Sequence, residues 1–81
     1  MKKFFFTFGS DDKFPFSKDD YVVVIAPTTA EAQKIFDKEY PPRIEGLGIS
    51  NCAFIYDEGD FEHFRGKYYN GKAPIRTLGG K

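Results

Sequence analysis

Cys52 and His63 are the single thiol and the single imidazole of the chain, so they are the first candidates for nucleophilic catalysis. A Cys–His pair needs hydrogen-bond reach and a cleft that excludes water. Cys52 lies in an apolar stretch, where a free cysteine is usually a small buried hydrophobe. His63 lies in a short, largely charged segment, so we expect it to be exposed. One Cys and one His also fall short of the ligand set of a zinc site. We therefore predict a non-enzymatic protein without catalytic residues.

Two further patterns suggest metal or phosphate binding but lack the spacing that either chemistry needs. Gly46 and Gly48 are not followed by the other glycines or the lysine of a phosphate-binding loop. Carboxylates bracket one predicted loop without the spacing of an EF-hand; they are Asp11, Asp12, Asp19 and Asp20. We interpret these acids as solvated turn residues, and we expect no metal and no cofactor.

Aromatic residues supply the strongest indication of binding. The chain has ten Phe and five Tyr in 81 residues, more than one small core is expected to bury. Rings in loops beside lysine and arginine suit contact with a protein or stacking on a base. The candidate contact residues are Phe14, Phe16, Tyr68, Tyr69, Lys72 and Arg76.

Charge and composition narrow the class of protein. Twelve basic and twelve acidic residues balance, so broad, non-specific attraction to nucleic acid is not expected. The acids and bases are nevertheless segregated, with an acidic run over Asp57–Glu62 and a basic segment from Arg65 onward. One cysteine cannot form an intramolecular disulfide, and no stretch has the length of a membrane span or a signal peptide. These features predict a cytoplasmic protein without a membrane partner.

The segment Tyr21–Tyr40 organises the elements that would position these residues. Tyr21–Ala26 is apolar on both faces, which is typical of a central strand. Thr28 and Glu31 have the spacing of a capping box, which predicts a helix over Thr29–Glu39. Apolar residues at helical spacing give that helix one buried stripe; they are Ala32, Ile35, Phe36 and Tyr40.

The remaining elements complete one small domain over residues 1–81, with 79–81 as a mobile tail. Besides the central strand and the helix, the patterns predict a strand over Lys3–Phe8, a strand over Cys52–Tyr56, a short helix capped by Asp57 and closed by Gly66, and an edge strand over Ala73–Leu78. This is an α+β fold: a three- or four-stranded sheet with one main helix packed on one face. The order of elements is also that of the β-grasp fold, to which ubiquitin belongs.

Several short motifs along the chain carry a second resemblance. They are Phe6-Thr7-Phe8-Gly9, Tyr21-Val22-Val23-Val24, Tyr40-Pro41, Asn51-Cys52-Ala53-Phe54-Ile55-Tyr56 and Tyr69-x-Gly71-x-x-Pro74. The chain thereby resembles a group of small uncharacterised proteins of Gram-positive bacteria, often found on prophages and other mobile elements. The resemblance implies a shared fold and a context, because accessory proteins of phages often bind and block host defence machinery.

Three functional hypotheses follow from these observations. The first is a non-enzymatic binding protein of phage or mobile-element origin that inhibits a bacterial defence system by contact with a host or bacterial protein. The alternative is sequestration of a small nucleotide or another anionic ligand, by tyrosine stacking and the basic C-terminal segment. The third is a ubiquitin-like carrier, since Leu78-Gly79-Gly80-Lys81 is similar to a Gly-Gly tail, although Lys81 would first have to be removed.

Overall fold

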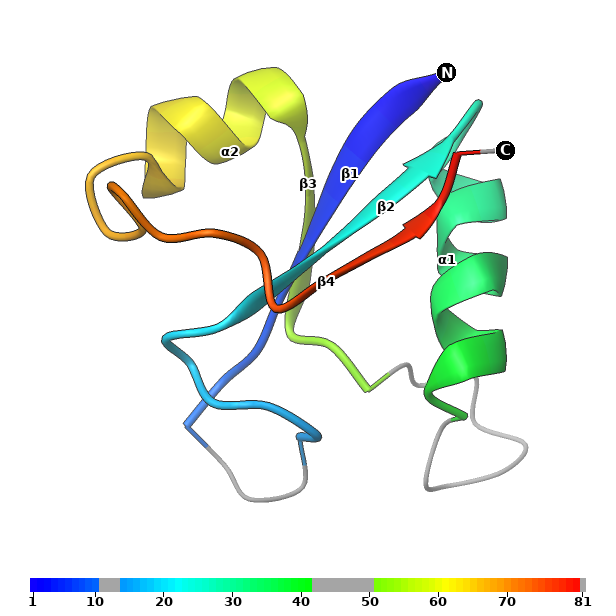
Figure 1. Ribbon diagram of the computed structural model, residues 1–81, viewed down its shortest axis with the longest axis horizontal. Coiled ribbons are helices and arrows are strands. Elements are labelled where there is room, and N and C mark those ends of the chain that lie inside the picture. The colour runs from blue at the N-terminus through cyan, green and yellow to red at the C-terminus, as the bar shows by residue number, and fades with distance from the viewer. Residues whose placement is uncertain (11–13, 42–50, 81) are drawn as a thin grey trace.

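The chain forms a four-stranded mixed sheet with a helix on each face (Figure 1). The computed structural model describes residues 1–10, 14–41 and 51–80. The elements in chain order are β1 (Lys2–Thr7), β2 (Tyr21–Ala26), α1 (Thr29–Glu39), β3 (Phe54–Asp57), α2 (Glu58–Arg65) and β4 (Arg76–Gly79). The strand order is β3-β1-β2-β4, with β1 antiparallel to both of its neighbours and β2 parallel to β4. The predicted α+β class is confirmed.

Strand β2 is central in the way its apolar run predicts. It pairs with β1 along one side and with β4 along the other. Because side chains alternate between faces, Val22 and Val24 pack toward α1 while Tyr21 and Val23 pack toward α2. A strand covered on both faces needs apolar residues at every position, and this is why the run YVVVIA is continuous.

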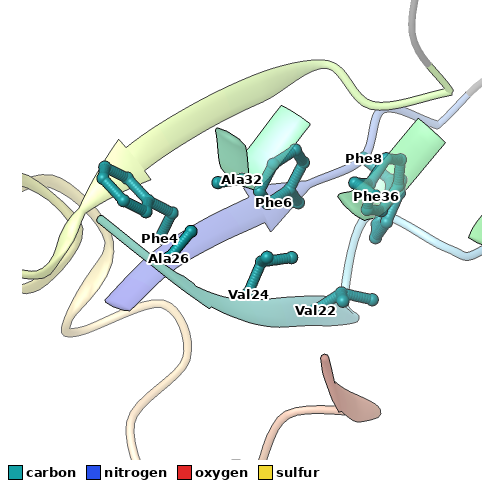
Figure 2. Packing of buried hydrophobic residues seen from close by; sticks show 8 residues of the cluster. All are labelled: Phe4, Phe6, Phe8, Val22, Val24, Ala26, Ala32 and Phe36. Atoms are coloured by element: carbon teal, nitrogen blue, oxygen red, sulfur yellow. The ribbon is translucent and has the colours of Figure 1, made fainter. Parts of the chain in front are cut away.

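Helix α1 has the predicted bounds and cap. The Oγ1 atom of Thr28 accepts a hydrogen bond from the backbone N–H of Glu31 at 3.2 Å. Ala32 and Phe36 are buried on the inner stripe, and Phe36 stacks on Phe6 of β1 with ring centroids 4.5 Å apart (Figure 2). Figure 2 shows this pair among the residues that β1 and β2 direct toward the helix.

Helix α2 covers the other face of the sheet. The carboxylate of Asp57 caps it, as predicted, by accepting from the backbone N–H of Asp60 at 2.8 Å. Phe61 is buried and stacks on Phe5 of β1 at 4.1 Å. Phe61 also packs on Tyr69 at 5.3 Å, so the turn after α2 closes this second apolar cluster.

Three of the predicted strands have different bounds in the structure. The first is shifted by one residue and spans Lys2–Thr7. The third strand begins at Phe54, so Cys52 lies before it, half-buried against the cluster on the α1 face. The last strand begins at Arg76 rather than Ala73, since Pro74 has no N–H for a ladder and regular pairing with β2 starts at Arg76. The predicted loop Arg43–Asn51 lies outside the described residues apart from Asn51. Of the predicted tail 79–81, Gly79 is the last residue of β4 and pairs with Ile25, and Lys81 lies outside the described residues. Neither helix among the described residues has the length and apolarity to cross a membrane.

The Phe6–Phe36 stack should dominate stability. We expect Phe36→Ala to lower the free energy of unfolding by about 3–5 kcal/mol, because it leaves a cavity in a fully buried site. Phe36→Leu should cost less, on the order of 1 kcal/mol, and keeps the test informative if the alanine variant does not fold. Urea denaturation measures both values. Phe64→Ala, at an exposed ring, is the matched control and should change stability by less than about 0.5 kcal/mol. Equal losses in the core and control variants would contradict the assignment of the core.

Candidate functional site

Three of the predicted contact rings take part in packing. Phe14 and Phe16 are half-buried against Phe8, with ring centroids 6.4 and 5.2 Å away. Phe16 also packs edge-on against Tyr40 at 5.2 Å. The ring of Tyr69 is only 5% exposed, since it packs within the cluster on the α2 face. These rings offer little surface to a partner.

Tyr68 and Lys72 both donate hydrogen bonds to Asp19. We call these two contacts, with the neighbouring one from Tyr69 to Lys18, the latch. The Tyr68 hydroxyl donates to Oδ1 of Asp19 at 2.5 Å, and Nζ of Lys72 donates to the Asp19 carbonyl at 3.3 Å. Beside them the Tyr69 hydroxyl donates to the Lys18 carbonyl at 2.9 Å. The latch therefore joins the loop before β2 to the turn after α2.

The sixth predicted residue, Arg76, lies away from this group. It is the first residue of β4, and its guanidinium forms an ion pair with Glu39 and donates to the Tyr40 hydroxyl at 3.3 Å. The hydrogen bonds with Tyr40 and Glu39 raise the pKa of Arg76 above its ordinary value. Its charge is thus engaged at the end of α1.

The structure brings a different set of rings to the surface. Phe54 is 59% exposed, Phe64 65% and Tyr68 47%. Tyr56 joins the first two, with centroids 6.1 Å from Phe54 and 6.5 Å from Phe64. The guanidinium of Arg65 lies 5.9 Å from the Tyr56 ring and 6.0 Å from the Tyr68 ring, within the range of cation–π contact. We call these five residues, Phe54, Tyr56, Phe64, Arg65 and Tyr68, the aromatic face.

Strand β3 and helix α2 position the aromatic face. β3 is an edge strand, and no described strand pairs with its outer side. Phe61 and Phe64 are three residues apart on α2; Phe61 points to the sheet while Phe64 packs beside Tyr56 near the edge. Sequence analysis predicted Tyr68 alone of the five. The surplus of rings was the available signal, but pairing order decides which strand is at the edge, and no sequence pattern states it.

Charges flank the aromatic face unevenly. Glu58, Asp60 and Glu62 are exposed on α2. Arg65 is half-buried among the rings; its Nε donates to the Tyr56 hydroxyl at 3.3 Å, and that bond is the main reason that its pKa lies above its ordinary value. Within the described ranges no carboxylate lies within salt-bridge distance of Arg65.

The thiol and the imidazole lie on different faces of the sheet. Cys52 packs with the cluster on the α1 face, while His63 is exposed on α2 with its ring 4.7 Å from that of Phe64. Among the residues that the structure places, no group of three or more His, Cys, Asp or Glu side chains could hold a metal ion.

Open hollows lie on the surface of the described part of the chain, and three of them bear on binding. One, of about 370 Å³, places Lys2 opposite Asp57 and Asp60. A second, of about 470 Å³, is lined by Phe14 and Phe16 with both Lys18 and Asp19. The third, of about 340 Å³, shares Phe54, Arg65 and Tyr68 with the aromatic face and also includes Lys18. Of the three, the third has two cations and, among the residues that the structure describes, no carboxylate in its lining.

No protein-family model, curated protein or solved structure matches the chain.

The latch should weaken in acid. The hydrogen bond from Tyr68 is the main reason that the pKa of Asp19 lies below its ordinary value; the same bond is the main cause of the raised pKa of Tyr68. A lowered carboxyl pKa stabilises the fold above the unfolded-state value of about 4 and loses that effect as pH falls through the folded-state value. Asp19→Asn should therefore reduce stability at pH 7, and the difference from wild type should shrink below pH 4.

Urea denaturation between pH 2.5 and 7, with NMR titration of the Asp19 carboxyl carbon, measures this effect. Asp20→Asn, one residue along, is the matched control for the loss of a charge. An Asp19 carboxyl that titrates at or above the unfolded-state value would contradict the assignment.

Proposed function

We propose that this chain is a non-enzymatic, cytoplasmic binding protein of phage or mobile-element origin that inhibits a bacterial defence system by occupying a surface of one of its proteins. The aromatic face is the proposed contact surface. The observation that carries the proposal is the gathering of Phe54, Phe64 and Tyr68 on one side of the molecule, each about half exposed or more.

The composition of the aromatic face supports contact with a protein. Tyr and Arg are enriched among residues that dominate binding energy, and aromatic rings bury large areas with few rotatable bonds. The three exposed rings lie around Arg65 and Tyr56, so a partner could cover the guanidinium as it buries the rings. Scattered apolar residues are normal on protein surfaces, but contiguous ones mark interaction sites.

The charge of Arg65 defines the chemistry of the partner. Its guanidinium is directed onto two tyrosine rings and has no carboxylate within salt-bridge distance among the described residues. A buried charge at an interface needs a counter-charge. The proposed partner is therefore a protein whose surface presents a carboxylate surrounded by apolar side chains. The origin and the target class rest on the resemblance of the strand and turn motifs to small prophage proteins.

The test is the loss of one specific partner when the aromatic face is altered. The chain, with a tag, is expressed in a Gram-positive host that carries a defence system, and proteins that co-purify are quantified by mass spectrometry. The variants are Phe54→Ala with Phe64→Ala, and the matched control Ile75→Ala, which removes a 44% exposed apolar side chain just before the opposite edge strand. Substitutions at such exposed sites should leave stability within about 0.5 kcal/mol.

We expect one protein to co-purify with wild type and Ile75→Ala and to be lost with the double variant. With purified partner, the double variant should raise the dissociation constant by at least about 30-fold, as for residues that dominate an interface. Wild type should also raise phage plating on the defended host, and the double variant should not. A partner retained at full affinity by the double variant would overturn the proposal.

A further inference from the structure

The hollow that shares Arg65 with the aromatic face has cations and aromatic rings in its lining. It lies where β1 and β3 approach the turn after α2, and its volume is about 340 Å³. The lining residues that matter are Thr7, Ser10, Lys18, Phe54, Arg65 and Tyr68. Ligand sites in proteins start at about 300 Å³, so this hollow has room for one small molecule and not for a dinucleotide.

Two cations border the hollow, and the described residues contribute no acid to its lining. Lys18 is exposed, and no described carboxylate lies within salt-bridge distance of it or of Arg65. The Nε atom of Arg65 donates to the Tyr56 hydroxyl. Its two terminal nitrogens remain as donors for which no described residue is an acceptor. A guanidinium fork presents such donors in the geometry that phosphate and carboxylate accept. Asp19 is not in the lining; its carboxylate accepts from the Tyr68 hydroxyl, and its charge also attracts Lys72 and Lys18.

Two exposed rings border the same hollow. Tyr68 is 47% and Phe54 59% exposed, so each residue offers exposed ring surface to a planar group. Stacking on aromatic side chains is how proteins hold bases without reading their sequence. Thr7, whose hydroxyl donates to the Phe54 carbonyl at 3.3 Å, also lines the hollow.

Rings and cations in one hollow select a ligand that is both planar and anionic. We infer that this hollow binds a free nucleoside monophosphate, with the base on Tyr68 or Phe54 and the phosphate on Arg65 and Lys18. The balanced net charge of the chain favours a small anion over a nucleic-acid strand, since a strand is held mainly by many phosphate contacts. This inference does not rest on the proposed partner protein, although the two sites share three residues.

The other hollows do not offer the same chemistry. The one beside Lys2 includes Asp57 and Asp60, and the one lined by Phe14 and Phe16 includes Asp19. A phosphate would meet a carboxylate in either. Of these three hollows, the one beside Arg65 therefore has the lining that favours an anion most.

The probe is adenosine 5′-monophosphate, titrated into the ¹⁵N-labelled chain and followed by NMR, with adenosine and inorganic phosphate in parallel. We expect a dissociation constant between about 10 µM and 1 mM. Adenosine and phosphate should each bind at least about tenfold more weakly, because each supplies only half of the contacts. Shifts should centre on the backbone amides of Ser10, Ala53 and Tyr68.

The variants separate this site from the aromatic face. Lys18→Ala keeps the carbonyl that Tyr69 uses, so the fold should persist while affinity for the nucleotide falls about tenfold. Lys34→Ala, an exposed lysine on α1, is the matched control and should not change affinity. Phe64→Ala alters the aromatic face outside the hollow and should leave nucleotide binding intact while it weakens the partner.

Three results would overturn the inference. The first is no shift with adenosine 5′-monophosphate at about 5 mM, well above the expected dissociation constant. The second is phosphate alone binding as tightly as the nucleotide, which would mean a plain anion site. The third is equal affinity in Lys18→Ala and wild type. None of these would bear on loss of the partner in the Phe54 and Phe64 variant.

Discussion

The pairing of β1 with β2 at the centre of the sheet is the interaction on which the rest of the structure depends. Both strands are paired on both sides and carry apolar side chains on both faces, so each face must be covered by a helix or by the turn that follows it. α1 covers one face through the Phe6–Phe36 stack, and α2 covers the other through the Phe5–Phe61 stack. A chain of 81 residues has little surface to spare for this task, and large rings bury the most area per residue. The high aromatic content is thus first a consequence of covering both faces of the sheet.

The surface follows from how unequally the two helices do this. α1 has eleven residues and reaches along the sheet, while α2 has eight and needs Tyr69 from the following turn to close its cluster. The rings of β3, of α2 and of the turn after α2 that this cluster does not bury form the aromatic face with Arg65. The latch then holds the turn after α2 to the loop before β2, through Tyr68, Tyr69 and Lys72. Tyr68 therefore serves both the fold and the proposed contact surface, whereas Phe64 serves the surface alone.

The arrangement of charge separates the two proposed uses of this region. Arg65 lies between the aromatic face and the hollow, with its guanidinium on tyrosine rings and its terminal donors directed to no described acceptor. A protein partner would meet it with a carboxylate among apolar contacts, and a small ligand would meet it with a phosphate beside a stacked base. Lys18 lines the hollow and Phe64 does not, so the two proposals can be tested apart.

The sequence by itself determined the central strand, the helix over Thr29–Glu39 and both helix caps, because these depend on neighbours in the chain: alternation, helical spacing and a capping oxygen three residues from its donor. It also determined that rings exceed the needs of a small core. The tertiary structure alone decided which rings those are. Pairing order placed Phe54 on an edge strand, and the packing of Phe61 left Phe64 outside while the cluster on α2 took in Tyr69. Such outcomes depend on contacts between residues far apart in the chain, which no local pattern records.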